Sequence, residues 1–499
     1  MGFATTMRAA LTSHEPTNRA KRRSSRFRVS PLVVGGFLAL ATLSLGPLTI
    51  PAIVALVLLP WFLSEPLRLY VLLLVTWPVA TLYVNIPLPA GIPDLRYERL
   101  VVLAIIGILV VGSLAGKRSL TGVPISVAVL VGLQLAWYFY HAASGGVADA
   151  GLSILISSTV LPVSLYWLTR ELITDRAAMQ VLLKTLLVVG LIVAFTGFYE
   201  RMLGGVYSPF PVETGTASGA RYLGVPGGRA AGVFGNPAIY GAVLAAALLA
   251  ARALFVETRH RVMVGLAGLV LGYGVFVSYT RSAWLAAVAA GLVAILVTTD
   301  VIRQLGRLLA AAAVLGIVVI ALLPGLIGQN EALRDRILET DNVSGRIDRA
   351  LYSWNLFLEN AATGLGPDSL DKSIAFEFAS EGKGFTSSHN TYLTMLVDGG
   401  AAVFAAAIAV FTSFMVGAYR VYRATSPGSP ARYALAAMLG TIVAVVTSGM
   451  ALELKYFAFF NSLYWIAGAT IANLIAMSRD DPGFRAPIPQ SVDGVTSMA

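Results

Sequence analysis

The chain has 499 residues, of which 57 % are hydrophobic and only 12 % are charged. A soluble domain carries about 25 % charged residues, so this composition excludes an ordinary cytosolic enzyme, a disordered protein and a nucleic-acid binder. The formal net charge of +10 fits membrane topology better than nucleic-acid binding, because the basic residues gather on one side of the predicted topology. Cysteine is absent and only four histidines are present, which excludes disulfides, thiolate metal sites and a cysteine nucleophile.

Long apolar runs recur along the chain and are separated by short polar or Gly/Pro segments. A bilayer core about 30 Å thick needs about 20 apolar helical residues per crossing, so each run predicts one membrane-spanning helix. The pattern predicts an all-α polytopic integral membrane protein with about 14 transmembrane helices, in a range of 12 to 14. The runs cover residues 31–48, 49–65, 68–88, 99–116, 122–142, 152–170, 178–200, 236–256, 262–280, 282–299, 307–327, 390–418, 432–452 and 456–477.

The orientation follows from the lysines and arginines, which favour the cytoplasmic side of a membrane. The basic tail, residues 1–30, is placed in the cytoplasm; it is too long for a signal peptide, and no clear cleavage site follows it. Alternating crossings then put 23 of the 36 lysines and arginines inside. Helices 1–11 fall in 31–327, helices 12–14 in 390–477, and the tail 478–499 is also cytoplasmic. We therefore expect a multi-pass protein of the cytoplasmic membrane, surrounded by membrane lipids.

Two outer segments are longer than connectors need to be, and such loops are usually functional or disordered. Segment 201–235 is rich in glycine and proline, and 328–389 forms one large extracytoplasmic loop with ten acidic and six basic residues.

Within the large loop, one apolar stripe has helical spacing: Ile347, Leu351, Trp354 and Leu358. The opposite face is charged, so residues 346–360 are predicted to form an amphipathic helix on the outer membrane interface. The run Gly364–Pro367 is expected to stop that helix.

Arginines on the outer side of the predicted topology need an explanation, because positive charge is disfavoured there. Arg281 interrupts two apolar runs, beside Trp284, and snorkelling to the interface is the alternative to ligand binding. Arg229 lies in a glycine-rich stretch, with Arg221 nearby. The alternative for Arg229 is a solvated loop arginine before a helix that Asn236 caps.

Arg346 and Arg349 stand at the start of the predicted amphipathic helix. Surface charges of this kind are usually solvated and contribute little. Arg349 is expected to accept lysine and to serve as a control for Arg346.

His389 ends the large loop and is followed by Asn390. An unperturbed imidazole titrates near pH 6.5 and can accept a proton near neutral pH. Ser387 or Ser388 could cap the next helix, so a cap does not explain the histidine. An interfacial histidine without chemistry is the alternative.

One histidine and several arginines thus gather on one membrane face. The guanidinium group binds phosphate in a bidentate manner and stays charged, so arginine clusters favour phosphate ligands. A base beside a diphosphate site indicates attack of a hydroxyl on a lipid-diphosphate donor. Glu339 and Asp341 could instead hold a metal, although two carboxylates in an acidic loop are mostly solvated. No P-loop, Rossmann, HExxH or GxSxG motif is present.

Three stretches together resemble the O-antigen ligase and O-antigen polymerase superfamily of bacterial membrane glycosyltransferases. They are RAAGVFGNPAIYGAVL at 229–244, YTRSAWLAAVAAGLV at 279–293, and a loop that opens with SGRIDRALYSWNLFLENAATGLGPDS at 344–369 and closes with HNTYLTMLVDGG at 389–400. The resemblance covers residues 229–400, and hydropathy alone relates the remainder.

The resemblance implies a GT-C-like helical membrane fold with an active site at the outer face of the bacterial cytoplasmic membrane. It implies an undecaprenyl-diphosphate-linked glycan as donor, a lipid or glycan as acceptor, an inverting reaction, and no metal or cofactor. His389 matches the catalytic histidine of the ligases, Arg281 and Arg346 match essential arginines, and Arg229 matches a further recurrent one. Asn390, Arg221 and Arg349 are placed as supporting residues.

Three functions remain to be distinguished. A ligase transfers the glycan to an acceptor, whereas a polymerase of the same superfamily adds repeat units to a lipid-linked chain. A flippase or transporter for lipid-linked glycan belongs to another class, and would carry polar residues through its midplane. The predicted spans hold little buried charge, with Lys184 as the main exception.

Overall fold

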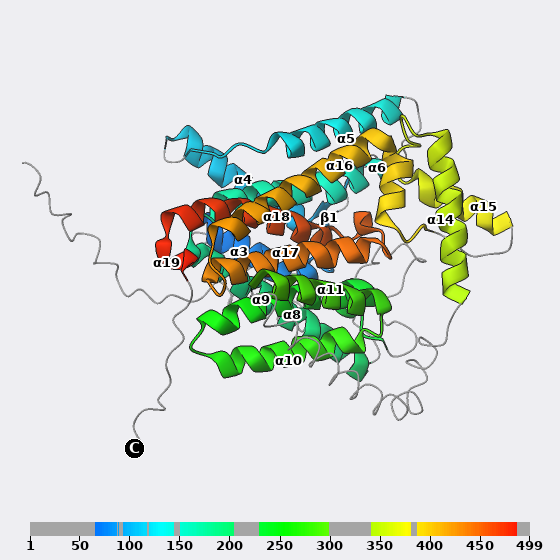
Figure 1. Ribbon diagram of the computed structural model, residues 1–499. Coiled ribbons are helices and arrows are strands. Elements are labelled where there is room, and N and C mark those ends of the chain that lie inside the picture. The colour runs from blue at the N-terminus through cyan, green and yellow to red at the C-terminus, as the bar shows by residue number, and fades with distance from the viewer. Residues whose placement is uncertain are drawn as a thin grey trace, which may run out of the picture.

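The computed structural model describes residues 65–86, 88, 93–116, 119–143, 150–203, 229–298, 341–380 and 387–486. This part of the chain is almost entirely helical, and most of its helices run along one common direction (Figure 1). Nine of the described helices are long and apolar enough to cross a membrane, and two shorter apolar helices, α3 and α10, accompany them. The prediction of an all-α polytopic membrane protein is confirmed. The predicted spans 31–48 and 307–327 lie outside the described residues, as does the span 49–65 apart from its last residue.

The described elements before the large loop are α3 (Pro66–Ala80), α4 (Tyr97–Leu114), α5 (Ile125–Ala143), α6 (Ala150–Leu155), the π-helical segment η1 (Ile156–Val160), α7 (Leu161–Leu172), α8 (Arg176–Leu203), the 3₁₀ turn η2 (Gly232–Phe234), α9 (Pro237–Glu257), α10 (Arg261–Val277) and α11 (Arg281–Thr298). The elements that follow are α14 (Asp341–Glu359), α15 (Ser369–Ser380), α16 (Thr391–Ala424), α17 (Pro430–Gly449), the 3₁₀ turn η3 (Leu454–Tyr456), α18 (Ala458–Asp480) and α19 (Pro482–Arg485). A two-stranded antiparallel sheet joins α3 to α4, with β1 (Asn85–Ile86) paired to β2 (Leu95–Arg96).

Side-chain caps explain where two helices begin. The Asn236 side chain accepts from the backbone N–H groups of Ala238 and Ile239, and Pro237 occupies the first turn, which confirms the predicted cap. Asn390 caps α16 in the same way. The expectation that Ser387 or Ser388 would cap that helix is wrong, because those residues precede a backbone turn at His389.

The centre of the bundle is α9, which is buried along most of its length between α8, α10, α11 and α17. Small side chains allow this close packing. A Cβ on Gly241 would lie 2.6 Å from the Cβ of Ala283, and Ala286, Ala290 and Ala294 continue the buried face of α11. Small residues at helix contacts are the usual means of packing helices within a membrane.

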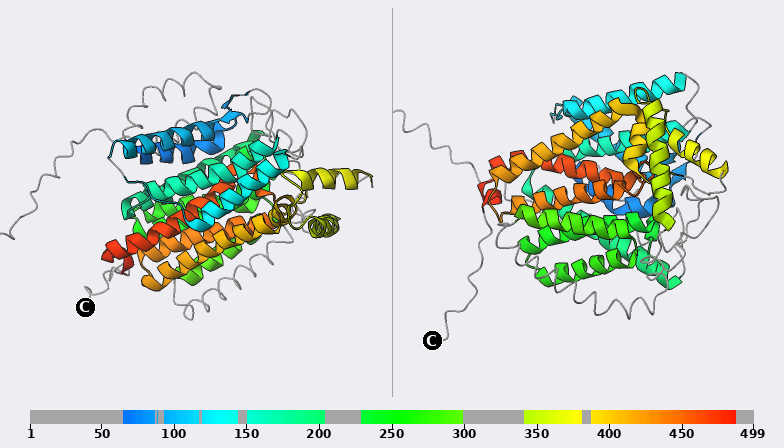
Figure 2. Two further views of the ribbon diagram at one scale, coloured as in Figure 1. Left: turned by 90° about the horizontal axis from the view of Figure 1, so that it is seen from above. Right: turned by 45° about the vertical axis from the view of Figure 1, so that its right-hand side comes forward.

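The bundle has two ends, which differ in what covers them. Helices α14 and α15 lie across one end, which we call the α14 end, and α19 marks the other, which we call the α19 end (Figures 1 and 2). The end of α8, the start of α11, the start of α16 and the end of α17 all meet at the α14 end.

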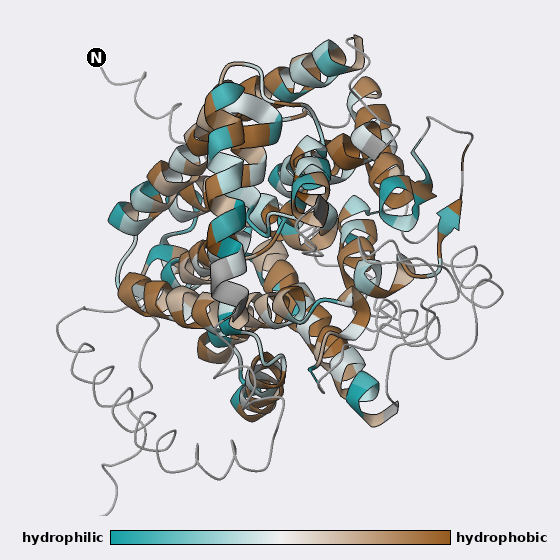
Figure 3. Ribbon diagram, turned by 90° about the vertical axis from the view of Figure 1, so that its right-hand side faces the viewer, coloured by the Kyte–Doolittle hydropathy of each residue, from teal (hydrophilic) through white to brown (hydrophobic). Residues whose placement is uncertain are grey.

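The predicted amphipathic helix at 346–360 is confirmed as α14, which crosses the end of the bundle instead of running along it (Figure 3). The predicted apolar face points away from the protein: Ile347, Leu351, Trp354 and Leu358 are 46–60 % exposed. The opposite face packs on Leu370, Ile374 and Phe378 of α15 through a second, smaller apolar core. This geometry is typical of a helix that lies in a membrane interface.

The connection from α14 to α15 docks on a kink in α16. The backbone N–H of Leu365 donates to Val397 at 2.8 Å, and that of Ala401 donates to Ala361 at 2.8 Å. Gly400 makes the kink possible with a φ of 73°, a conformation that glycine adopts without strain. A Cβ on Gly364 would collide with the carbonyl of Asp398. The large loop is therefore fastened to the helix that follows His389.

Candidate active site

His389 lies at the α14 end, directly before α16, with an exposed side chain. Its backbone φ is 52°, a left-handed conformation that is uncommon outside glycine and clusters at functional sites. The backbone N–H donates to Oε1 of Glu453 at 3.0 Å, and the ring Nδ1 lies 3.0 Å from the Ser387 hydroxyl. The surroundings thus fix both the backbone and one ring nitrogen.

Glu453 holds the segment beneath His389. It lies in the connection between α17 and α18 and is 4 % exposed. Its Oε1 accepts from the Ser388 hydroxyl at 2.8 Å as well as from His389. Thr391 fastens the same connection, since its backbone N–H donates to Leu452 and its hydroxyl accepts from Leu454. The start of α16 is therefore tied to a segment more than sixty residues later.

A charged cluster lies behind Glu453 and is centred on Lys455. The Lys455 Nζ lies 3.0 Å from Asp371, 3.3 Å from Asp368, 3.5 Å from Asp398 and 3.6 Å from Glu453. Four acids around one lysine leave an excess of negative charge in a largely buried place. Burial of such charge is costly unless a proton is taken up.

The surroundings favour protonation of Glu453 over its neighbours. Burial, the neighbouring carboxylate of Asp371 and a hydrogen bond to it raise the pKa of Glu453 to about 8. Lys455 and hydrogen bonds hold the pKa of Asp371 below its ordinary value, and the surrounding carboxylates raise the pKa of Lys455. These opposite shifts favour a protonated Glu453 beside an ionised Asp371, while Oε1 of Glu453 accepts from His389 and Ser388.

The imidazole of His389 is neutral at pH 7. Partial removal from water, together with the positive charges of Arg349 and Arg346, lowers its pKa to about 4, and Asp371 opposes this shift. A neutral imidazole offers one lone pair, as a general base must. A pKa this low also makes the free protein's histidine a weak base.

Arg349 does not occupy the exposed position expected from the sequence. It is 5 % exposed, and it donates to the backbone carbonyl of Gly345 at 2.9 Å and to that of Ser387 at 3.0 Å. The expectation that Arg349 is a solvated control is wrong, because the polar face of α14 turns toward His389 at this position. Arg349 instead joins α14 to the His389 segment.

Arg346, three residues earlier on α14, has an exposed side chain. Its charge contributes to the lowered pKa of His389, so the two residues share one electrostatic environment. The N-terminal part of α14, which carries Arg346, lies on the side of α9–α11, and its other end lies near α5 (Figures 1 and 2). A contact of His141 with the carbonyl of Thr363, 3.2 Å long, marks that second side.

The backbone segments that carry Arg281 and Arg229 meet on the α9–α11 side. The backbone N–H of Ala230 donates to Val277 at 3.1 Å, which brings Arg229 to the turn that leads into Arg281. Tyr279 in this turn is buried and has a left-handed φ of 42°. Arg281 is exposed as the first residue of α11, and Arg229 is partly buried.

Two further residues at this place could not be recognised from the sequence. Glu200 accepts from the backbone N–H groups of Ala231 and Gly232, at 2.7 and 2.6 Å, and so holds the segment after Arg229. The guanidinium of Arg201 lies 5.7 Å from the centre of the Tyr279 ring. Both stand at the end of an ordinary apolar helix with no motif around them. Arg221 and Glu339 lie outside the described residues.

The described residues contain no group of three or more histidine, aspartate or glutamate side chains arranged to hold a metal ion. In the cluster around Lys455, the ammonium group occupies the centre that a cation would need.

Comparison with known proteins bears on this arrangement. Residues 266–408 match a family described as "O-Antigen ligase". The match confirms the resemblance to the O-antigen ligase and polymerase superfamily. It begins within α10, covers α11, α14, α15 and the first half of α16, and includes Arg281, Arg346 and His389. Glu453, Lys455 and Arg229 fall outside the matched segment. Among curated proteins, none matches the chain.

Proposed function

We propose that the protein is an O-antigen ligase-like glycosyltransferase that moves a glycan from an undecaprenyl-diphosphate carrier to an acceptor hydroxyl at the α14 end. One observation carries this proposal: a neutral, backbone-fixed histidine lies on the same end as Arg281, Arg229 and Arg346. The superfamily match supports ligase or polymerase chemistry in general. We assign His389 as the base and the three arginines as the diphosphate site.

The reaction is a single displacement. The acceptor O–H loses its proton to Nε2 of His389 while its oxygen attacks the anomeric carbon. The bond from that carbon to the diphosphate oxygen breaks, so the configuration inverts and lipid diphosphate leaves. We assign the tautomer in which Nδ1–H donates to the Ser387 hydroxyl, 3.0 Å away, because it leaves the Nε2 lone pair available. The arginines stabilise the negative charge that develops on the leaving group, and no metal is required.

Donor binding strengthens the base in this scheme. In the free protein, Arg349 and Arg346 hold the pKa of His389 low. A diphosphate bound near Arg346 compensates part of that positive charge, and a protonated imidazole then becomes less costly. The general base is thereby matched to its task once the donor is in place.

The proposed membrane arrangement follows the sequence. The α14 end faces the outside of the bacterial cytoplasmic membrane, both termini are cytoplasmic, and 12 to 14 helices form a GT-C-like fold. The apolar face of α14 then rests on the outer interface. Cysteines placed at Ser387 and Ser426 in this cysteine-free chain test the orientation. An impermeant maleimide should label Ser387→Cys from outside and Ser426→Cys only after permeabilisation.

The proposed activity is tested with purified protein, purified lipid-linked glycan and a lipid acceptor. We expect glycan-bearing acceptor and free undecaprenyl diphosphate to appear together. Movement of intact donor across a vesicle membrane with no change in its glycosidic bond would establish the transporter instead.

The acceptor class is tested in a deletion strain. Intact lipid-linked chains that fail to reach the acceptor indicate a ligase, whereas loss of the longer chain lengths indicates a polymerase.

A further inference from the structure

Helix α14 has one face on the protein and one face that the described residues leave uncovered. Its apolar stripe, made of Ile347, Leu351, Trp354 and Leu358, is exposed, whereas Arg349 on the opposite face is buried. The helix crosses the end of the bundle, so its uncovered face is turned toward the surroundings of that end (Figure 1). Two contacts therefore act on α14: whatever covers the stripe, and the protein that Arg349 binds.

The membrane interface is the occupant that fits the apolar stripe. The connection after α14 contacts α5 where the His141 ring meets the carbonyl of Thr363 at 3.2 Å. α5 is long and apolar enough to cross the membrane, and its residues Phe139 and Tyr140, next to His141, are 65 % and 58 % exposed. The lipid that surrounds α5 therefore reaches the end of α14. An amphipathic helix in such a place buries its apolar face at the boundary between head groups and acyl chains.

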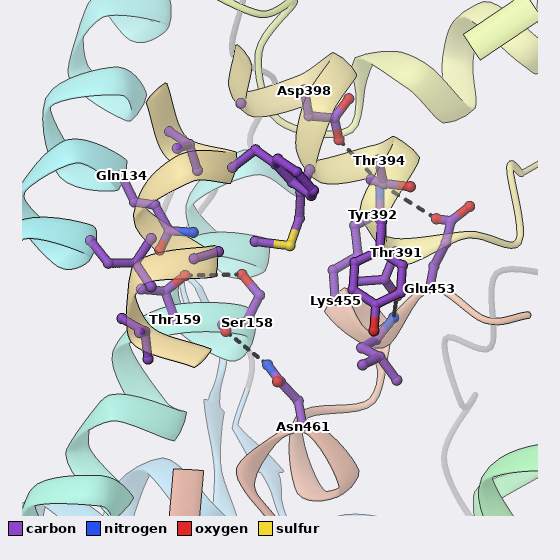
Figure 4. Close-up of a pocket in the computed structure, with 18 of the residues that line it drawn as sticks. Gln134, Ser158, Thr159, Thr391, Tyr392, Thr394, Asp398, Glu453, Lys455 and Asn461 are labelled. Carbon is purple, nitrogen blue, oxygen red and sulfur yellow. Dashed lines mark hydrogen bonds and ion pairs between the residues drawn. The ribbon is translucent and has the colours of Figure 1, made fainter. Parts of the chain in front are cut away.

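The backbone turn at His389 is held from two sides. Its left-handed φ of 52° is strained in a residue other than glycine, so it persists only where the surroundings impose it. Glu453 holds the N–H of His389 from the bundle, where it lines a cavity beside Thr391 at the start of α16 (Figure 4). Arg349 holds the backbone carbonyl of Ser387 from α14, two residues before the turn. One of the two holding residues thus belongs to the helix that meets the membrane interface.

Arg349 is also linked to the imidazole ring through Ser387. The guanidinium donates to the Ser387 carbonyl at 3.0 Å, and the hydroxyl of the same residue lies 3.0 Å from Nδ1 of His389. A shift of α14 therefore moves the group that fixes the ring. A misplacement of about 1 Å is enough to lower a rate by about 100-fold, because proton transfer needs a precise approach.

The charges that face His389 come from three elements. α14 contributes Arg349 and Arg346, α15 contributes Asp371, and the connection between α17 and α18 contributes Glu453. Partial removal from water is the largest cause of the low pKa of His389, and Arg349 is the strongest of the charges that lower it. Withdrawal of Arg349 should therefore raise the pKa of His389 toward its ordinary value, as well as release Ser387.

We infer that Arg349 is a positioning residue that conveys the contact of α14 with the membrane interface to His389. The base is ordered for proton transfer while the apolar stripe of α14 lies in lipid, and it loses that order when the stripe does not. The inference rests on the proposed function, because His389 is the base proposed there. It makes glycan transfer depend on the surface of the membrane that carries the lipid-linked donor.

The first test compares Arg349→Gln with Arg349→Lys in the full-length protein, held in nanodiscs of phosphatidylethanolamine and phosphatidylglycerol. Diethyl pyrocarbonate acylates neutral imidazole, so the pH dependence of His389 modification, read on its own peptide, reports its pKa without glycan transfer. The midpoint should lie at about pH 4 in the wild type and move toward 6.5 in Arg349→Gln. The kcat of transfer at neutral pH should fall at least about tenfold in the same variant.

Arg349→Lys keeps the charge and one donor, so it should keep the wild-type midpoint and recover part of the lost kcat. A merely structural role would lower the activity of both variants without moving the midpoint. An unchanged midpoint in Arg349→Gln would therefore overturn the assignment of Arg349 as a positioning residue.

The second test removes the membrane contact. Leu351→Ser combined with Trp354→Ser makes the stripe polar at exposed positions, and Phe139→Ser is the matched control, because it changes an exposed aromatic residue on a helix that carries none of the charges facing His389. The double serine variant should move the midpoint upward and lower kcat, whereas the control should match the wild type. Addition of Arg349→Gln to the double serine variant should cause no loss beyond that of Arg349→Gln alone, because the two changes interrupt one path.

Additive losses would overturn the coupling through Arg349. A double serine variant that behaves as the wild type in these nanodiscs, which contain no partner protein, would overturn the membrane as the occupant of the stripe. The modification of His389 needs neither donor nor acceptor. If it follows the expected pattern while no sample transfers glycan, the proposed activity fails and the coupling of α14 to His389 stands.

Discussion

The two ends of the bundle differ in how they use charged residues. At the α19 end, Arg432 is buried and donates to the carbonyls of Val297, Tyr422 and Thr425 at 2.8, 2.6 and 2.9 Å. Arg252 donates to the carbonyl of Ala294 and to Thr298. These arginines satisfy backbone carbonyls at helix ends and so fasten neighbouring helices to one another.

At the α14 end, the buried Arg349 also donates to carbonyls, but carboxylates hold the backbone at the two places proposed for binding and catalysis. Glu200 binds the N–H groups after Arg229, and Glu453 binds the N–H of His389. Arg281 and Arg346 have exposed side chains at the same end. The comparison teaches that an arginine at a helix end is structural where it is buried among carbonyls. A ligand-binding role is a better hypothesis for an exposed arginine where carboxylates already bind the nearby backbone.

The largest effect on transfer, apart from loss of the base, is expected at the exposed arginines. Arg281→Lys and Arg346→Lys should each lower kcat/KM at least about tenfold, or about 1.4 kcal/mol, because lysine keeps the charge without the bidentate fork. Arg261→Lys is the matched control, since Arg261 is also the exposed first residue of a helix but lies at the α19 end. Near-normal turnover in both lysine variants would contradict the assignment of Arg281 and Arg346 to the diphosphate site.

Glu453 should show a smaller effect that depends on the replacement. Glu453→Ala removes the acceptor for His389 and Ser388 and should lower kcat by about tenfold, since a lost hydrogen bond to a buried group costs about 1–3 kcal/mol. Glu453→Gln keeps the acceptor oxygen and a donor toward Asp371, as the protonated acid does at neutral pH. It should stay within about threefold of the wild type. Equal losses in the two variants would mean that the ionised carboxylate is the active form.

The next expected effect is a shift in the pH dependence of glycan transfer. The reaction needs neutral His389, so kcat/KM should fall only as the pH approaches about 4, well below the value of an ordinary histidine. The acid limb of kcat should lie at higher pH, because the bound diphosphate compensates the charges that lower the pKa of His389. Arg346→Gln should move the limb of kcat/KM upward for the same reason. A limb near pH 6.5 in the wild type would contradict the electrostatic description of the free site.

The smallest effect on transfer is expected at the α19 end. Arg432→Ala leaves buried carbonyls without donors and should lower the stability by about 2–4 kcal/mol, with unchanged transfer per folded molecule. Thermal unfolding in detergent and an activity assay on the same sample provide both values. A selective loss of transfer, with the melting temperature unchanged, would contradict the purely structural role of Arg432.

Local sequence patterns predicted the elements that depend on local interactions. The apolar runs gave the described spanning helices, because each run is long enough for one crossing. The spacing of Ile347, Leu351, Trp354 and Leu358 predicted α14 and its apolar face. Asn236 and Pro237 predicted the start of α9.

The support of His389 could not be predicted because it is made by distant segments. Glu453 is 64 positions from His389, and Asp371 belongs to a different helix. The prediction that Arg349 is solvated was wrong for a related reason. Its burial depends on which face of α14 meets the end of the bundle, and the charged face of an isolated helix does not reveal this.

The difference between the α14 end and the α19 end is tested most directly by glycan transfer in two histidine variants. His389 lies at the α14 end and His260 at the α19 end, and both side chains are exposed. With purified lipid-linked donor and acceptor, His389→Ala should lower the transfer rate by at least about 100-fold, in line with the usual contribution of a general base. His260→Ala should transfer as the wild type does, and both variants should melt at the wild-type temperature. Transfer within a few-fold of wild type in His389→Ala would show that another group takes the proton, and would contradict the assignment of the base.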